Sequence, residues 1–167
     1  MAEKEELIRE KVEHSGIFDF KGFYRFAHSW LIEESFGVVE EKYSEKVSGN
    51  SRNILFEWVA SKRLSDYFKF EIKIEVEVEG LTDVEVEIDG ERKKMNKGKV
   101  AGKVKGSLIK DPNSKWDTSP FSRFMRDVYN KYIIPGRVSS MEDLLKGNVT
   151  SFKEELKAFL ELSGRRK

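Results

Sequence analysis

The residues of this chain with the most evident binding chemistry form a basic run in its second half. From Arg92 to Lys110 there are eight basic residues and no acidic one. Lysine and arginine side chains gathered on one strand could bind the phosphates of RNA or DNA, or lipid headgroups. The candidate binding residues of this predicted basic ridge are Arg92, Lys93, Lys94, Lys97, Lys99, Lys103 and Lys105.

The stretch before the basic run suggests a second interpretation. Residues 71–91 contain nine acids and a single base, Lys73. If the two stretches form neighbouring strands, each opposed pair contributes about 0.2–1 kcal/mol and helps to fix the register. We favour this mutual neutralisation. The binding hypothesis then rests on the lysines that flank a predicted turn, where fewer acids can oppose them: Lys93, Lys94, Lys97 and Lys99.

Glu34 is the second candidate. A helix over Phe20–Ser35 places it near the middle of an apolar stripe, close to Trp30. A carboxylate buried there would have a raised pKa unless a cation such as Lys62 or Arg63 met it. Because position 34 lies in the last turn of the predicted helix, where the chain already leaves it, we favour a solvated or salt-bridged carboxylate and keep the buried one as the alternative.

Other chemistries are limited by the residue types present. The chain has no cysteine, which excludes disulfides, thiolate catalysis and thiolate zinc sites. His14 and His28 are too few for a metal site made mainly of histidine. Phosphate-binding glycine motifs and the nucleophile-elbow motif do not occur. We therefore predict no catalytic residue, no metal and no cofactor, and expect that the protein is not an enzyme.

The spacing of apolar residues predicts the elements that would position these candidates. Residues 3–13 read as a short helix within an N-terminal arm over residues 1–16. Phe20–Ser35 has an apolar stripe with a period of 3.6 residues, typical of a helix packed on a core. Alternation of apolar and other residues then predicts strands at 39–47, 54–58, 67–79, 84–88, 91–95 and 99–110.

The strand at 67–79 defines the sheet, because its alternation is strict. One face is apolar and the other is charged, as in a sheet with one packed and one solvated side. Asp89-Gly90 predicts a two-residue hairpin turn, and Asn96–Gly98 a further turn. Gly102 and Gly106 share the apolar face, where they leave room for a bulky neighbour or mark a bend.

The last third of the sequence predicts helices. One covers residues 119–132 and ends at Pro135-Gly136, a short one runs from Ser140 to Gly147, and the last covers 151–162. Trp116 lies in the preceding polar loop and is expected to plug the end of the sheet. The predicted fold is α+β: a curved antiparallel meander of about five to six strands, with its apolar face covered by N- and C-terminal helices. It forms a single domain over residues 17–163, followed by a basic tail at residues 164–167.

The composition restricts the class of protein. Charged residues make up 37% of the 167 positions, yet the net charge is only +1, which argues against a dedicated polyanion binder. Abundant lysine and glutamate with no glutamine is typical of thermostable proteins. No apolar run approaches the length of a membrane span, and the charged N-terminus is unlike a signal peptide. We therefore expect a cytoplasmic protein.

Four short motifs together resemble a group of uncharacterised small archaeal proteins. They are Phe23-Tyr24 with Trp30, Ser65-Asp66-Tyr67-Phe68, Met95-Asn96-Lys97-Gly98 and Ser119-Pro120-Phe121. The resemblance spans most of the chain. It implies no activity, cofactor or catalytic residue.

Three functional hypotheses follow. The leading one is a non-catalytic protein-interaction or assembly module, whose partner is a second copy or another protein. The first alternative is a nucleic-acid or anionic-surface binder that uses the basic ridge; it is weakened because Phe68 and Phe70, which could stack on bases, fall on the opposite face. The second alternative is a carrier of a small apolar ligand held between sheet and helices, near Glu34 and Trp58.

Overall fold

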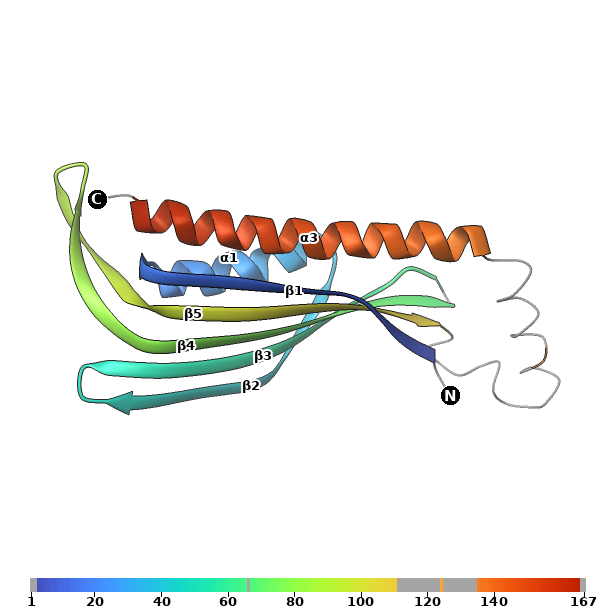
Figure 1. Cartoon of the computed structure of the whole chain (residues 1–167), viewed down its shortest axis with the longest axis horizontal. Helices are drawn as coiled ribbons and strands as arrows, with labels where there is room; N and C mark the ends of the chain where they lie inside the picture. The colour runs from blue at the N-terminus through green and yellow to red at the C-terminus, as the bar shows by residue number, and fades with distance from the viewer. Residues whose placement is uncertain (1–2, 66, 111–123, 125–134, 166–167) are drawn as a thin grey trace.

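The structure is a computed structural model that describes residues 3–65, 67–110, 124 and 135–165. It consists of an antiparallel sheet and two helices (Figure 1). The α+β class with an antiparallel sheet is thus confirmed. The predicted helix at 119–132, except for Phe124, and the loop with Trp116 lie outside the described residues.

The sheet has five strands in the order β1-β5-β4-β3-β2, and all neighbouring strands are antiparallel. Consecutive hairpins join β2 to β5, whereas β1 closes the opposite edge by pairing with β5. Their bounds are β1 Glu3–Phe18, β2 Gly37–Ser48, β3 Ser51–Arg63, β4 Phe68–Ile88 and β5 Glu91–Lys110.

The prediction of an N-terminal helix over residues 3–13 is wrong, because this segment is strand β1. Ile8 and Val12 are four residues apart, which suits one side of a helix. In a strand the same two residues also share one face, with Glu10 between them. The long free edge of β5 supplies hydrogen-bond partners along the whole segment, and this tertiary pairing decides the outcome. A register shift between Glu6 and Ile8 marks a bulge in the new strand.

Strands β4 and β5 are longer than predicted. Asp89 and Gly90 form the expected turn, with φ of 52° and 81°. The predicted breaks at residues 80–83 and 96–98 are absent from this hairpin: β4 continues past Gly80 through a bulge, and Asn96 pairs with Asp83. In Figure 1 the far end of the hairpin bends toward the helices.

The bulge in β4 reverses the direction in which its acidic residues point. Glu75, Glu77 and Glu79 lie on the solvent face, where Glu79 opposes Lys99. Three residues of β4 then oppose two of β5, so that Asp83 and the acids after it point to the helix side. Asp83 accordingly contacts Arg52 and Asn96 on that side.

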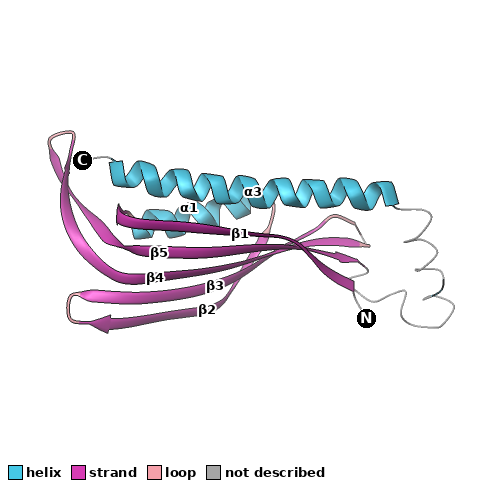
Figure 2. Ribbon diagram, in the orientation of Figure 1, coloured by secondary structure: helices cyan, strands magenta, loops and turns pink. Residues whose placement is uncertain are grey.

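Both helices lie on one side of the sheet (Figure 2). Helix α1 spans Phe20–Glu33, as predicted to within two residues, and Asp19 caps its start by accepting a hydrogen bond from the Gly22 N–H at 3.1 Å. Helix α3 spans Pro135–Arg165 as a single element. The predicted helix end at Gly147 is wrong, since α3 continues through it. The helix at 119–132, for which Pro135-Gly136 was the predicted end, lies outside the described residues except for Phe124, and Pro135 itself begins α3. Neither helix of the described residues is long and apolar enough to cross a membrane.

The core fills the space between the sheet and the two helices. The apolar residues of β4 on this face, from Phe68 to Val78, are all at most 3% exposed, as their alternation predicts. Gly106 of β5 explains how closely α3 approaches, because a Cβ atom there would lie 2.7 Å from Val149 and 3.0 Å from Ile8. The predicted room for a bulky neighbour is therefore occupied by α3.

Candidate functional site

Glu34 is not a buried carboxylate, so the less favoured of the two interpretations is wrong. It is the exposed C-cap residue of α1, and its backbone N–H donates to the Trp30 carbonyl at 3.1 Å. The chain leaves the helix there, as the favoured interpretation required. Lys62, expected as its counter-charge, instead lies 5.6 Å from the centre of the Phe36 ring.

The seven residues of the predicted basic ridge do not form one surface. They are spread along β5, in which alternate side chains point to opposite faces of the sheet. Arg92 and Lys94 point to the helix side, and the others to the solvent side. Four of the seven lie directly opposite an acid of β4, which agrees with the neutralisation that we favoured: Arg92–Glu87, Lys94–Glu85, Lys99–Glu79 and Lys103–Glu75.

A hollow with several charged and aromatic side chains lies elsewhere, along the side of α1 that faces β2 and β3. We call it the α1–β2 groove. Its volume is about 520 Å³, and it is lined by Phe20, Lys21, Tyr24, Arg25, Glu40, Tyr43, Glu45 and Arg52. A smaller hollow of about 380 Å³ shares Phe20, Lys21 and Arg52 with it and extends toward Asp83 and Asn96.

The helical wall of the groove is fixed at the first turn of α1. Asp19 caps this turn, and the Phe20 N–H donates to the Asn96 Oδ1 atom at 3.0 Å, which ties α1 to the β4–β5 hairpin. Lys21 and Arg25 are four residues apart, so they lie on one side of the helix with Tyr24 beside them. The helix therefore presents two cations and one phenol to β2.

The strand wall depends on a bulge in β2. The register with β3 shifts between Glu40 and Lys42. In a regular strand, Glu40 and Tyr43 would point to opposite faces, because their positions differ by an odd number. The extra residue places both side chains on the helix side, where they meet Tyr24.

A single carboxylate oxygen organises the inner end of the groove. Oε1 of Glu40 accepts hydrogen bonds from the Tyr24 hydroxyl at 2.8 Å and from Trp58 Nε1 at 3.3 Å. Burial, together with this contact to Glu40, raises the pKa of Tyr24 to about 12. Burial also raises the pKa of Tyr43, with Glu45 as the next cause. Both phenols thus stay protonated at neutral pH; Tyr24 donates its proton to Glu40, which leaves Tyr43 as the phenol that can donate to a bound molecule.

The aromatic floor of the groove consists of Phe20, Tyr24 and Tyr43, and Tyr24 packs on buried rings beneath it. The Tyr24 ring meets Trp58 at 5.0 Å, Phe56 at 5.2 Å and Tyr43 at 6.4 Å, each close to edge-to-face. Trp58 and Phe56 are fully buried, whereas Tyr43 is 46% exposed. The floor therefore ends in a ring that is available to a bound molecule.

The charges of the groove are not balanced internally. Arg52 is held by Glu45 at 3.4 Å and by Asp83 at 3.1 Å, and Glu40 accepts only neutral donors. Lys21 and Arg25 are exposed and make no ion pair with any of the described residues. Two cations at the rim, above an aromatic floor, suit a ligand with a flat ring and a negative charge.

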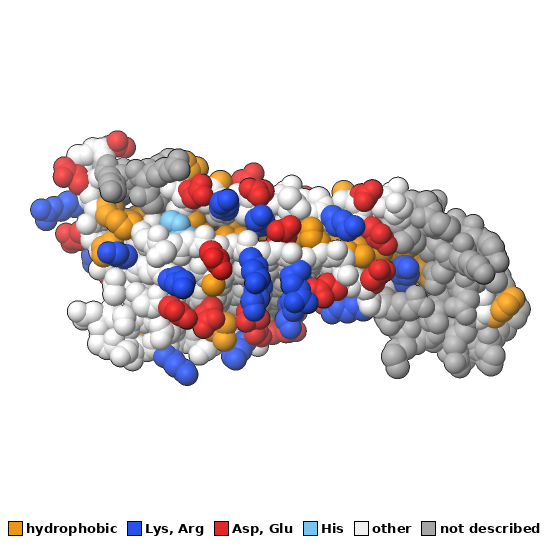
Figure 3. All heavy atoms as spheres, viewed as in Figure 1, with side chains coloured by type: hydrophobic (Ala, Val, Ile, Leu, Met, Phe, Trp, Pro, Cys, Tyr) orange, Lys and Arg blue, Asp and Glu red, His pale blue; other side chains and the backbone are white. Residues whose placement is uncertain are grey.

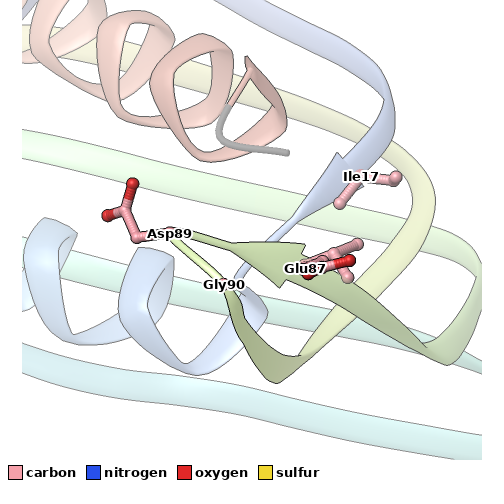
Figure 4. Close-up of a pocket in the computed structure, with 5 residues that line it drawn as sticks. Ile17, Glu87, Asp89 and Gly90 are labelled. Carbon is pink, nitrogen blue, oxygen red and sulfur yellow. The ribbon is translucent and has the colours of Figure 1, made fainter.

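A hollow of about 510 Å³ at the tip of the β4–β5 hairpin lacks this convergence (Figure 4). It is lined by Ile17, Val86, Glu87, Asp89 and Gly90. The Asp89 side chain points away from Glu87 and Ile17. The carboxylates of Asp89 and Glu87 therefore do not face a common point. In the described part of the chain, no group of three or more metal-ligating side chains occurs either.

The sequence analysis did not identify Glu40, Tyr43 or Arg52 as site residues. Nothing in the local pattern reveals the bulge that brings the first two to the helix side. Searches against protein-family models, curated proteins and solved structures found no match to this chain. The groove is therefore interpreted from its own residues alone.

Proposed function

We propose that this protein binds a small planar aromatic molecule with an anionic group in the α1–β2 groove. The observation that carries the proposal is the combination of a half-exposed ring, Tyr43, with two cations at the rim, Lys21 and Arg25, that form no ion pair within the described part of the chain. The proposal retains the ligand-carrier hypothesis but moves the site from Glu34 to the side of α1 that faces Tyr43.

The ring of the ligand would lie against Tyr43 and Tyr24. Contacts between aromatic rings are worth about 0.5–1.5 kcal/mol beyond the area that they bury. The Tyr43 hydroxyl could donate a hydrogen bond to a polar substituent, and the Tyr24 oxygen, whose proton is donated to Glu40, could accept one. The Tyr24–Glu40–Trp58 contacts are already in place, so little side-chain ordering is required on binding.

The anionic group would lie between Lys21 and Arg25. These side chains are four residues apart on one helix face, and Arg25 can donate two parallel hydrogen bonds to a carboxylate, sulfonate or phosphate. Their contribution should be moderate and sensitive to salt, because both side chains are exposed.

A pair of fluorescent probes tests the proposal. Anilinonaphthalene sulfonate has the required rings and charge, whereas N-phenylnaphthylamine has the rings alone. We expect the anionic probe to bind more tightly, and the double variant Lys21→Glu/Arg25→Glu to weaken its binding by roughly tenfold, since two charges are reversed. Binding of the neutral probe should change little.

Two further variants serve as controls. Lys46→Glu changes a lysine of β2 that opposes Asn53 on the other face of the sheet, and should leave both affinities unchanged. Tyr43→Ser should weaken both probes, because it removes the exposed ring. Equal affinities of the two probes, or an unchanged affinity of the double variant, would contradict the proposal.

A further inference from the structure

A second group of basic residues lies on the solvent face of the sheet, away from the α1–β2 groove. We call it the outer-face cation cluster, and it consists of Arg9, Lys11, Lys73, Lys103 and Lys105. Arg9, Lys105 and Lys73 oppose one another directly on β1, β5 and β4. Lys11 and Lys103 form the next row. In Figure 3, lysine and arginine side chains gather at the centre of the visible face of the sheet.

This arrangement opposes the sequence expectation for β5. Pairing with β4 gives Lys103 an acidic neighbour, Glu75, but it gives Lys105 a lysine. Pairing with β1, which the sequence did not predict, adds a cation opposite each of them. Like charges directly opposite each other on neighbouring strands are destabilising, so that the neutralisation of β5 fails at this place.

Acidic residues lie mainly at the margin of the cluster, apart from Glu75, which completes the row of Lys11 and Lys103. Arg9 forms an ion pair with Glu6 at 2.9 Å, and Lys4 forms one with Glu71 at 2.6 Å. The hydrogen bond from Arg9, together with the charge of Lys105 nearby, holds the pKa of Glu6 below its usual range. The four lysines of the cluster make no ion pair with the residues that the structure describes.

The dimensions of the cluster indicate the size of its ligand. Neighbouring strands are about 4.8 Å apart, and second neighbours along a strand about 7 Å. Three strands and two rows therefore cover an area of roughly 10 by 7 Å. Glu6 and Glu71 lie on one side of this area, and Glu13 and Glu77 on the other. A long polyanion would have to pass over these acids, whereas a compact one within the area would lie beside a single acid, Glu75.

We infer that the outer-face cation cluster binds a compact, multiply charged phosphate group, such as a short polyphosphate chain. The five cations supply donors for several phosphate oxygens at once, and Arg9 can donate two parallel hydrogen bonds. A bound phosphate group would also remove the repulsion within the Arg9–Lys105–Lys73 row. This site shares no residue with the α1–β2 groove and does not depend on it.

Calorimetric titration of the full chain with tripolyphosphate at low and moderate salt tests the inference. We expect binding that weakens as salt rises, and an increase in Tm on addition of the anion. Lys105→Glu should abolish the binding. It should also raise the Tm of the free protein, because the new carboxylate would face Lys73 on one side and Arg9 on the other.

The opposite signs of these two effects separate a binding role from a structural one. Lys99→Glu is the matched control on the same strand, where Lys99 opposes Glu79 and Ser15. It should lower the Tm and leave tripolyphosphate binding within about twofold, because the cluster lies beyond a Debye length of roughly 8 Å. If Lys105→Glu does not fold, the double variant Lys73→Gln/Lys105→Gln should lose binding without loss of fold.

Three results would overturn the inference. They are no tripolyphosphate binding at low salt, retention of binding by Lys105→Glu, and tighter binding of a single-stranded RNA that Lys99→Glu also weakens. Vesicles that contain phosphatidylinositol bisphosphate distinguish the source of the phosphates. Loss of vesicle binding in Lys105→Glu would assign the site to a headgroup and support the same chemistry.

Discussion

The two edge strands of the sheet, β1 and β2, differ in how far they are covered by the rest of the protein. Strand β1 lies against α3, with Val12 buried in the core and Glu10 paired to Lys153 of α3 at 3.4 Å. No strand among the described residues lies beyond β2, and Val39 and Val47 are 61% and 69% exposed. One edge is thus part of the core, whereas the other is open to solvent and carries the wall of the α1–β2 groove.

Both edges contain a bulge, but the two bulges do different things. The bulge in β1, between Glu6 and Ile8, adjusts how β1 meets β5 and α3. The bulge in β2 turns Glu40 and Tyr43 to the same side. Bulges also discourage unwanted pairing at an open edge. The comparison indicates that stability depends mainly on β1, and the binding properties of the groove on β2.

The largest expected effect is a loss of stability when a charge replaces a valine of β1, compared with the same change in β2. Val12→Asp would put a carboxylate at a position that is 3% exposed, and should lower the free energy of unfolding by about 4 kcal/mol. Val47→Asp should change it by less than about 0.5 kcal/mol, since the residue is solvated. Urea denaturation measures both. Similar losses for the two variants would show that β2 is as much part of the core as β1.

Deletion of Glu41 tests the bulge in β2. Loss of one residue forces either Glu40 or Tyr43 to the opposite face, so the groove should lose its affinity for anilinonaphthalene sulfonate. The free energy of unfolding should fall by about 1–3 kcal/mol. Glu41→Ala keeps the residue count and is the control. If the deletion variant still bound the probe as the parent does, the bulge would not be what shapes the groove.

The pH dependence of stability probes the Tyr24–Glu40 contact. The folded state holds the pKa of Tyr24 at about 12, above its ordinary value of 10.0. The unfolded chain therefore releases this proton first, so the stabilisation is complete below pH 10 and is lost as the pH rises toward 12. Tyr24→Phe should reduce the fall in Tm over this interval. An unchanged fall would mean that other groups, such as lysines, account for it.

The smallest expected change in stability belongs to a test of self-association. The leading hypothesis from the sequence, a protein-interaction or assembly module, stays a prediction, and β2 is the strand on which it can be tested. Size-exclusion chromatography with light scattering would detect self-association, which the double variant Val39→Lys/Val47→Lys should reverse, with a change in stability of less than about 0.5 kcal/mol. If the parent protein is monomeric at high concentration, self-assembly is excluded and only binding to another protein remains of this hypothesis.

How much the sequence revealed depended on how local each signal was. The strict alternation from Phe68 to Val78 predicted both the strand and its buried face, and Asp89-Gly90 predicted the turn, because each depends on residues close together in the chain. The apolar stripe predicted α1 equally well. Strand β1 was missed because its spacing suits either element, and only the distant edge of β5 decides between them.

The candidate sites were predicted less well, for a related reason. Cross-strand neighbours determine whether Lys105 meets an acid or a base, and those neighbours depend on register. The sequence showed the charge of each strand but not that Lys105 lies between Arg9 and Lys73. The buried alternative for Glu34 failed because α1 ends at Glu33 and the chain turns away at Ser35, which has a φ of 69°.

The bulge at Gly80 also divides the molecule by how firmly its parts are held. Up to Leu81, the helix side of β4 is apolar and fully buried; beyond it, the same side carries Asp83, Glu85 and Glu87. The end of the hairpin therefore has strand hydrogen bonds but little buried apolar surface to protect them. It should open and close independently of the rest of the sheet, at a free energy well below that of global unfolding. The exception is the contact of Asn96 with Phe20, through which such opening would loosen the first turn of α1.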